Sequence, residues 1–351
     1  MLAESVVEVG RVPDQGIQPR LIVGSNGEIH LVYFKKSAGQ EKSRQGNLYY
    51  RQWNAGAGQW HPPVKVSSRQ YSHLGPVSKA SVAVDDEGRI HVIWFLPTSG
   101  AYRYARSNTE RTHFEAERNP VTAHNEGLEA EASIVVRGAN VTISWHAGDL
   151  SQEYKRAVYT LTSSDNGKIF GRIKRASNPG LGACACCSLA TAFNDQGQLQ
   201  IAYRSAIRDK GRHMQFLTVG FLEEDSNLRT VGEWNISSCP VSTNALMGEW
   251  LAFETQGRIQ MMNVTENKDA EQVRDSKVRQ KHPAIAINSD GDRLIVWGEA
   301  AGYFEGGSLQ MQKFDSQGTP IQTEDHSSLK IPQFSIAATV ARTDGSFLVL
   351  Y

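Results

Sequence analysis

Residues 80–94 read ASVAVDDEGRIHVIW, a pattern that recurs along the chain. A run of small and apolar residues comes first, Gly88 follows, and an alternating run then ends in an aromatic residue, Trp94. Alternation with a period of two indicates a β-strand, and a glycine between two such runs indicates a hairpin. The stretch therefore predicts two antiparallel strands joined by a tight turn.

The same unit occurs seven times in the sequence. A glycine separates the two strands in six copies, and Gly138-Ala139-Asn140 does so in the third. The copies occupy residues 19–34, 80–94, 132–145, 188–203, 251–262, 283–297 and 336–351. Further extended segments follow most copies, so that one unit supplies up to four strands, as in a propeller blade. The sequence predicts an all-β propeller of four-stranded antiparallel blades.

The number of hairpins predicts the number of blades, and the N-terminal residues predict how the ring closes. Seven hairpins favour seven blades, but the fifth copy looks abbreviated, because Gly257 and Gly291 are too close in sequence for a full blade. Six blades are therefore the alternative. Residues 5–9 form an orphan strand before the first copy, and we expect this N-terminal strand to close the ring. No linker interrupts the pattern, so residues 1–351 are expected to form one domain.

The composition argues against a nucleic-acid partner and a membrane span. The 37 lysines and arginines balance 37 aspartates and glutamates, so no basic footprint is indicated. No apolar run approaches the roughly 20 residues of a membrane helix. The first ten residues lack the basic start and apolar centre of a signal peptide. The protein is expected either to be cytosolic or to have lost a signal peptide.

Four cysteines are the most unusual feature of the composition, and three of them fall within four positions. They are Cys184, Cys186, Cys187 and Cys239. An even number of cysteines among short strands fits disulfides in an oxidising compartment, which favours a periplasmic or secreted protein. A bridge between adjacent Cys186 and Cys187 would strain the peptide, so one of them is expected to reach Cys239. The alternative to two disulfides is a soft-metal site, with copper(I) the best match to thiolate and imidazole ligands.

Residues 163–170, SSDNGKIF, resemble the Asp-box, the Ser-x-Asp-x-Gly-x-x-aromatic turn of sialidase-like (BNR) propellers. Ser163 and Asp165 can bond the backbone of the turn, Gly167 permits a positive φ, and Phe170 can pack between sheets. The motif falls where the repeat places the turn between third and fourth strands. The chain thus resembles sialidase-like propellers over nearly its whole length.

Within that superfamily, the cysteine pattern resembles one bacterial extracytoplasmic group. Cys184-Ala185-Cys186-Cys187 and the later Cys239-Pro240 carry this resemblance. It implies a periplasmic or secreted address and implies no particular reaction.

The candidate site lies at the funnel mouth, where inner strands begin and second strands end. We expect a polar ring there that binds a small ligand, a metal or a protein partner. The candidate ligand-binding residues are Arg20, His146, Arg204 and Glu299. The candidate metal ligands beside the cysteines are His73, His124 and His282.

A non-hydrolytic binding role is favoured, because the resemblance to sialidases does not extend to all of their catalytic residues. The resemblance implies a tyrosine nucleophile, a glutamate partner, an aspartate acid and three arginines that hold a carboxylate. Arg20 and Arg204 match two of the arginines, but a third arginine and a late tyrosine cannot be placed, and Tyr303 lies in a glycine-rich loop. The alternatives are an exo-sialidase-type glycoside hydrolase and a structural scaffold that holds another protein.

Overall fold

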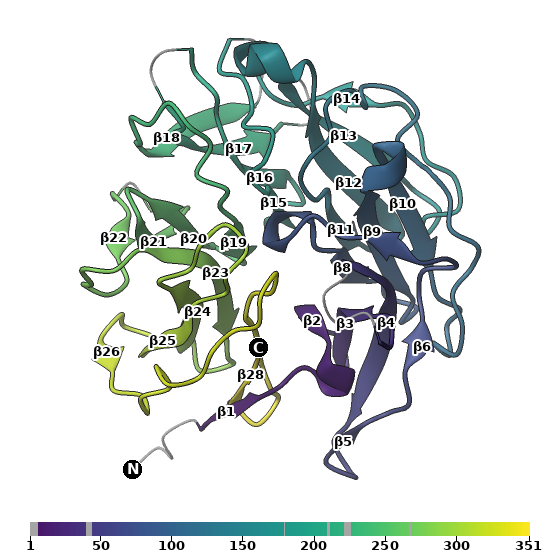
Figure 1. Ribbon diagram of the computed structural model, residues 1–351, viewed down its shortest axis with the longest axis vertical. Coiled ribbons are helices and arrows are strands. Elements are labelled where there is room, and N and C mark those ends of the chain that lie inside the picture. Colours follow the sequence, from purple (N-terminus) through teal and green to yellow (C-terminus); the bar gives the residue numbers. More distant parts are fainter. Residues whose placement is uncertain (1–5, 40–43, 179, 209–210, 221–225, 267) are drawn as a thin grey trace.

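The computed structural model describes residues 6–39, 44–178, 180–208, 211–220, 226–266 and 268–351. Within these residues the strands form seven sheets around a common axis (Figure 1). Helical structure there is limited to the 3-10 turns η1 (Pro13–Gln15), η2 (Pro76–Ser78), η3 (Pro97–Ser99) and η4 (Leu150–Lys155). None of the described helices has the length and apolar character that crossing a bilayer requires. The predicted all-β propeller is confirmed, with seven blades rather than six.

The blades follow one another along the chain. Blade 1 comprises β2 (Ile17–Val23), β3 (Ile29–Lys36), β4 (Gln45–Asn54), β5 (Gln59–Trp60), β6 (Val64–Lys65) and β7 (Tyr71–Ser72). Blade 2 comprises β8 (Ser81–Val84), β9 (Ile90–Leu96) and β10 (Ala101–Arg106). Blade 3 comprises β11 (Ser133–Arg137), β12 (Asn140–Ala147), β13 (Ala157–Ser163) and β14 (Lys174–Arg175). Blades 4 and 5 comprise β15 (Ala190–Phe193), β16 (Leu199–Arg204), β17 (Met214–Val219) and β18 (Asn227–Gly232), then β19 (Asn244–Met247), β20 (Trp250–Thr255), β21 (Arg258–Asn263) and β22 (Glu271–Gln272). Blades 6 and 7 comprise β23 (Gln280–Ile287), β24 (Arg293–Glu299), β25 (Ser308–Phe314) and β26 (Pro320–Ile321), then β27 (Ala338–Ala341), β28 (Phe347–Leu350) and β1 (Val7–Gly10).

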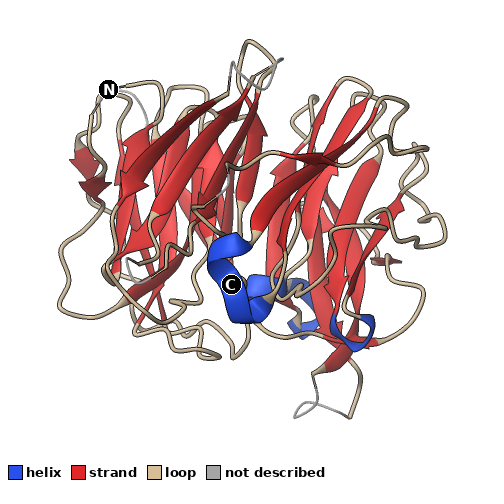
Figure 2. Ribbon diagram, turned by 90° about the horizontal axis from the view of Figure 1, so that it is seen from above, coloured by secondary structure: helices blue, strands red, loops and turns tan. Residues whose placement is uncertain are grey.

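The first strands of the blades contact one another in a closed ring. The successive contacts are β2 with β8, β8 with β11, β11 with β15, β15 with β19, β19 with β23, β23 with β27 and β27 with β2. Seen at right angles to the first view, strands of neighbouring blades run alongside one another (Figure 2). All seven inner strands line an axial channel of about 410 Å³.

The N-terminal strand closes this ring, as predicted. β1 pairs with β28, the second strand of blade 7, with Val7 opposite Phe347 and Gly10 opposite Leu350. The pairing is parallel, which is possible because β1 comes from the other end of the chain and is not joined to β28 by a hairpin. Blade 7 is therefore built from both ends of the sequence.

The expected abbreviation of the fifth unit is wrong. Residues 251–262 lie in β20 and β21, the second and third strands of blade 5, and Gly257 lies in the turn between them. The inner strand is β19, which pairs with β20 across a turn at Gly248. The pattern had been displaced by one strand, because β20 and β21 have the same apolar character as a first hairpin. Blade 5 has its four strands.

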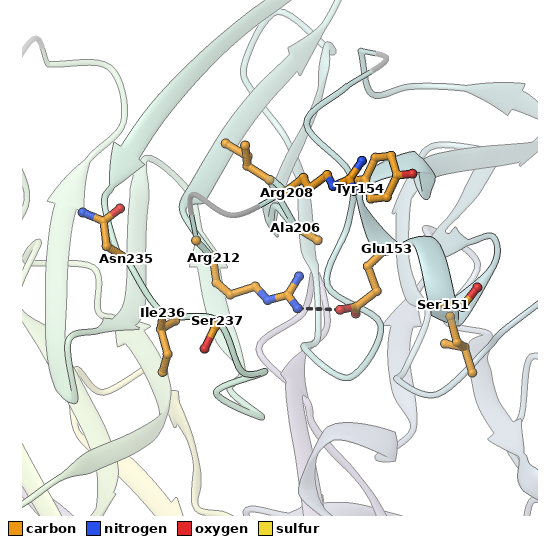
Figure 3. Close-up of a pocket in the computed structure, with 12 residues that line it drawn as sticks. Ser151, Glu153, Tyr154, Ala206, Arg208, Arg212, Asn235, Ile236 and Ser237 are labelled. Atoms are coloured by element: carbon orange, nitrogen blue, oxygen red, sulfur yellow. Dashed lines mark hydrogen bonds and ion pairs between the residues drawn. The ribbon is translucent and has the colours of Figure 1, made fainter.

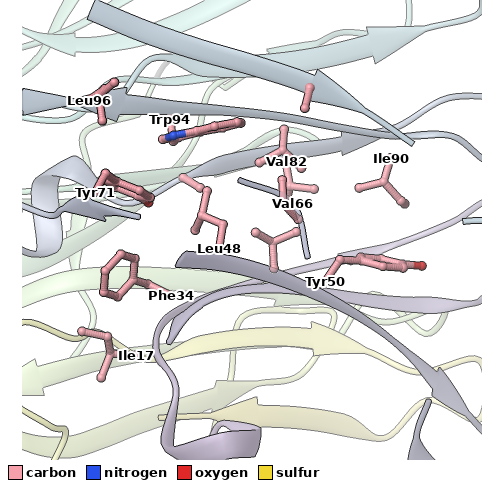
Figure 4. Close-up of a cluster of buried hydrophobic side chains, with 14 of the residues drawn as sticks. Ile17, Phe34, Leu48, Tyr50, Val66, Tyr71, Val82, Ile90, Trp94 and Leu96 are labelled. Carbon is pink, nitrogen blue, oxygen red and sulfur yellow. The ribbon is translucent and has the colours of Figure 1, made fainter. Parts of the chain in front are cut away.

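The alternation along the second strands places side chains in two different interfaces. In β9, Ile90, Val92 and Trp94 pack in the cluster between blades 1 and 2 (Figure 4), together with Phe34 and Leu48. The intervening Ile93 and Phe95 belong to the next cluster, between blades 2 and 3. Each central strand is thus buried on both faces, and the ring is held together by apolar packing between blades.

Residues 163–170 lie between β13 and β14, in the outer part of blade 3. The Ser163 hydroxyl donates to Asp165 Oδ1 at 2.6 Å and accepts the N–H of Gly167 at 3.0 Å. Asp165 Oδ1 also accepts the N–H of Ile169 at 2.9 Å, and Gly167 has a φ of 75°. Phe170 meets the ring of Tyr104 in blade 2 edge-on, at 5.2 Å between centroids. The turn therefore ties two blades together away from the mouth.

The closure of the ring can be tested by removing its N-terminal strand. A chain that begins at Arg11 should melt at a lower temperature than the whole chain, because β28 loses one of its two partner strands and Val7 and Val9 no longer pack against blade 7. Adding a peptide of residues 6–12 should restore part of the melting temperature. A peptide of scrambled sequence is the control, and an unchanged melting temperature after truncation would contradict closure by β1.

Candidate functional site

The cysteines lie in two connections that reach the funnel mouth at neighbouring inner strands. Cys184, Cys186 and Cys187 lie between β14 and β15, and Cys239 lies between β18 and β19. Because β15 and β19 contact each other in the ring, the two connections meet at the junction of blades 4 and 5.

All four sulfur atoms converge there. Cys186 and Cys239 form a disulfide, so the expected bridge to Cys239 is confirmed and its partner is Cys186. Cys184 and Cys187 are buried thiols, with their sulfur atoms 3.4 Å apart. The sulfur of Cys239 lies 3.2 Å from that of Cys184 and 3.7 Å from that of Cys187. The structure thus has one disulfide and two thiols, whereas the sequence left open two disulfides or four metal-binding thiols.

Backbone hydrogen bonds hold the cysteine loop against three neighbouring segments. The N–H of Cys184 donates to Arg204 O at 2.9 Å, at the end of β16. The N–H of Ala185 donates to Glu153 Oε1 at 2.8 Å, and the N–H of Ser188 donates to Ser242 O at 3.1 Å. The loop is thereby fixed to blades 3, 4 and 5 while its sulfur atoms face one another.

Arg204 is buried, and its guanidinium is committed to the protein. Its Nη1 donates to Arg212 O at 2.8 Å and its Nη2 donates to Glu254 O at 2.5 Å, which links blades 4 and 5. The guanidinium also lies over the ring of Trp234, at 5.3 Å from the centroid. These contacts leave Arg204 as a structural bridge beside the sulfurs.

The two thiols are inequivalent in their acidity. Burial raises the pKa of Cys187, but the hydrogen bond from Cys184 and the charge of Arg204 outweigh burial and bring that pKa to about 7. The hydrogen bond to Cys187 and burial both raise the pKa of Cys184. Cys187 is thus the first of the pair to ionise, and Cys184 keeps the shared proton.

A second cation lies near this pair. Lys281, at the start of the inner strand of blade 6, is buried and donates from Nζ to Pro240 O at 2.8 Å. Burial lowers the pKa of Lys281 to about 8, although Glu254 and Cys187 act in the opposite direction. Negative charge on sulfur is therefore compensated from two directions.

A pocket of about 620 Å³ lies beside the cysteine loop (Figure 3). Its walls come from η4, from the connection between β16 and β17, and from residues 235–237 ahead of Cys239. Glu153 and Arg212 extend toward each other across it and form an ion pair at 2.5 Å. The carboxylate of Glu153 also binds Ala185, so the pocket and the cysteine loop share a wall.

The three histidines expected beside the cysteines lie elsewhere at the mouth. His73 packs edge-on against Phe34 and Phe334 on the side of blades 1 and 7. His124 stacks on Tyr159, at 4.3 Å between centroids. His282 is buried with Nδ1 3.3 Å from Thr243 Oγ1. Among the described residues, the one group of potential ligand atoms close enough to share a metal ion is all sulfur: Cys184, Cys186 and Cys239, of which the last two are joined in the disulfide.

The proposed ligand-binding residues are spread over the mouth and do not form one cluster. His146 contacts the cysteine loop, with Nε2 2.8 Å from Cys187 O. Arg20 lines the axial channel, as do Lys79 and Glu131, which form a buried ion pair with each other. Glu299 ends β24 on the side of blade 6.

Sequence reasoning missed Glu153, Arg212, Glu254 and Lys281. Arg212 lies just before β17, and the starts of third strands face the mouth just as the ends of second strands do. Examining the starts of third strands as well as the ends of second strands would have identified Arg212. Lys281 directly precedes His282, which is a predicted metal ligand. Glu153 lies in η4, and nothing in its local sequence indicates that it binds Ala185.

The bridge can be tested by Cys239→Ser. The disulfide joins residues 53 positions apart, and loop-closure entropy gives such a bridge on the order of 4 kcal/mol. The variant should melt at a clearly lower temperature than the wild type, and a reductant should then lower it little further. Ser238→Ala is the matched control and should melt as the wild type does. Equal melting temperatures for Cys239→Ser and the control would contradict a stabilising bridge.

Comparisons with known proteins relate the chain to others through its fold. No family model matches the sequence, and no curated protein matches it. A structure of a protein of unknown function from Dyadobacter fermentans has a TM-score of 0.56 at 13% identity, over 91% of this chain and 96% of that one. The α-L-arabinanase of Penicillium chrysogenum complexed with arabinobiose has a TM-score of 0.55 at 11% identity, over 88% and 95%. The Trypanosoma rangeli sialidase complexed with sialic acid has a TM-score of 0.52 at 12% identity, over 82% of this chain and 52% of that chain. The chain therefore shares a β-propeller fold with these structures.

Proposed function

We propose that this chain is an extracytoplasmic, non-hydrolytic propeller that binds a soft metal ion, copper(I), at the sulfur cluster of its funnel mouth. The convergence of four cysteine sulfur atoms carries the proposal. Sulfur donors select soft ions, whereas carboxylate and carbonyl oxygens suit magnesium and calcium. Because Cys184 and Cys187 are thiols, they can supply ligands while the bridge stays intact.

The surroundings fit an anionic metal–thiolate group. Two thiolates and one copper(I) carry a net charge of minus one, which needs compensation in a buried place. Arg204 and Lys281 lie close enough to Cys187 for their charges to interact with it, and Arg204 is already held in place by its own hydrogen bonds. Burial of both thiols also limits access of water and oxidants to the bound ion.

One observation favours an extracytoplasmic address, and two others favour a non-hydrolytic role over a sialidase. A disulfide is typical of an oxidising compartment such as the periplasm or the exterior. Of the two arginines that could hold a substrate carboxylate, Arg204 is buried and bonded to backbone carbonyls. Tyr303, the remaining candidate nucleophile, is 58% exposed and packs on Phe304.

Metal binding is tested by anaerobic titration of copper(I) in competition with a chromogenic chelator. The wild type should bind one ion in the state with one disulfide, and Cys184→Ser/Cys187→Ser should lose it, because both ligands are gone. His113→Gln, which removes an exposed imidazole far from the mouth, is the control and should bind as the wild type does. An absence of binding by the wild type, or unchanged binding by the double variant, would refute the site.

Hydrolysis is tested with fluorogenic sialosides and α-L-arabinosides. The wild type and Arg20→Ala should both give background rates, because the arginine set and the nucleophile are incomplete. A sialidase of known activity serves as the positive control. Turnover by the wild type that Arg20→Ala abolishes would show that the mouth is an enzyme active site.

A further inference from the structure

We propose that the four cysteines also form a thiol–disulfide exchange centre, in which the bridge on Cys239 moves between Cys186 and the buried thiols. The inference goes beyond metal binding: it concerns the same cysteines but needs no metal. It rests on the contacts of a single atom. The sulfur of Cys239 is bonded to Cys186 and is also in contact with the sulfurs of both Cys184 and Cys187.

Each exchange step is balanced within the protein. The thiolate of Cys187, the first of the pair to ionise, attacks the sulfur of Cys239, a Cys187–Cys239 bond forms, and the Cys186–Cys239 bond breaks. Cys186 leaves with the electron pair and takes up the proton that Cys187 gave away. Attack by Cys184 balances in the same way after Cys184 has lost its own proton. The number of disulfides and thiols is unchanged, so that no oxidant or reductant is consumed.

The competing bridges close loops of nearly the same size. The sequence separation from Cys239 is 53 for Cys186, 55 for Cys184 and 52 for Cys187. Because the entropy of loop closure depends on the logarithm of loop length, it does not distinguish the three bridges. The preference among them is set by local contacts alone, and no refolding of the blades accompanies the exchange.

The backbone on both sides is held in place, so the exchange needs side-chain movement only. Hydrogen bonds from Cys184 and Ala185 fix the cysteine loop to Arg204 and Glu153. On the other side, Pro240 O accepts hydrogen bonds from Lys281 and Arg279. The sulfurs can therefore change partners on a rigid frame.

The exchange changes which thiol is accessible to solvent. Cys186 and Cys239 are partly exposed, whereas Cys184 and Cys187 are buried. Moving the bridge inward leaves a free thiol on the partly exposed Cys186. The Glu153–Arg212 pocket lies against the same loop and has room for a thiol-bearing ligand, such as a small thiol or a cysteine side chain of another protein. The centre thus presents a reactive thiol to external thiols and disulfides without exposing the buried pair.

Cys186→Ser tests which sulfurs can pair with Cys239. After equilibration in a glutathione redox buffer with a metal chelator and quenching in acid, peptide mapping should find Cys239 bonded to Cys184 or Cys187, with one thiol left. This variant should also melt well above Cys239→Ser, because the long loop stays closed. Three free thiols in a folded Cys186→Ser protein would overturn the proposal.

Trapping in the wild type tests the exchange without any substitution. Prolonged native alkylation with N-ethylmaleimide should label Cys186 in molecules whose Cys239 is bonded to Cys184 or Cys187. In Cys184→Ser/Cys187→Ser, which can form only the Cys186–Cys239 bridge, Cys186 should stay unlabelled. If labelled wild-type molecules all retain the Cys186–Cys239 bridge, the proposal is wrong. Neither experiment depends on copper, so the outcome is independent of the metal titration.

Discussion

The closed ring of inner strands is the constraint on which the rest of the molecule depends. Each blade can bury both faces of its sheet only if a neighbour lies on either side. The first and last blades meet this condition because β2 contacts β27, and Leu31 and Tyr33 pack in one cluster with Leu348. The ring also fixes which connections are neighbours at the mouth. Cysteines more than 50 positions apart in sequence meet because β15 and β19 are adjacent in the ring. The site is thus a consequence of topology more than of local sequence.

The charged groups around the sulfur atoms both link neighbouring blades and influence the acidity of the thiols. Arg204 links two blades through carbonyl groups, yet the same guanidinium lowers the pKa of Cys187. Glu153 pairs with Arg212 and also holds the N–H of Ala185. The guanidinium of Arg204 donates to backbone carbonyl groups and forms no ion pair with a carboxylate among the described residues, so its positive charge is available to a sulfur anion beside it.

The sequence was sufficient for the fold and for one bridge, and insufficient for the site around it. Alternation and turn glycines predicted the seven hairpins, and the strain of a vicinal bridge predicted that Cys239 pairs with Cys186 or Cys187. The register of blade 5 was misread, because the apolar pattern of β20 and β21 is locally the same as that of an inner hairpin. The histidines and the cysteines lie near the starts of inner strands, a position that sets only their height along the axis. The order of the blades separates them around the ring, because His73 and His124 lead into blades 2 and 3 and the cysteines lead into blades 4 and 5. His73 lies by blade 7, and Glu153 was missed because its contact with Ala185 joins two blades.

The proposed metal binding and the proposed disulfide exchange depend on the same property, the contact of soft sulfur atoms whose backbone is held in place by hydrogen bonds. The two proposals differ in which sulfur atoms carry the negative charge. With the bridge on Cys186, the two thiols lie inside and the bonded pair separates them from solvent. With the bridge on Cys184 or Cys187, one thiol stays buried and the other appears at Cys186, so the two can no longer act as a buried pair of ligands. A bound soft ion would hold the thiols in the first arrangement, and its loss would release them to the second. If both proposals hold, the position of the bridge and the occupancy of the metal site are linked, because a ligand that binds one arrangement of the sulfur atoms stabilises that arrangement.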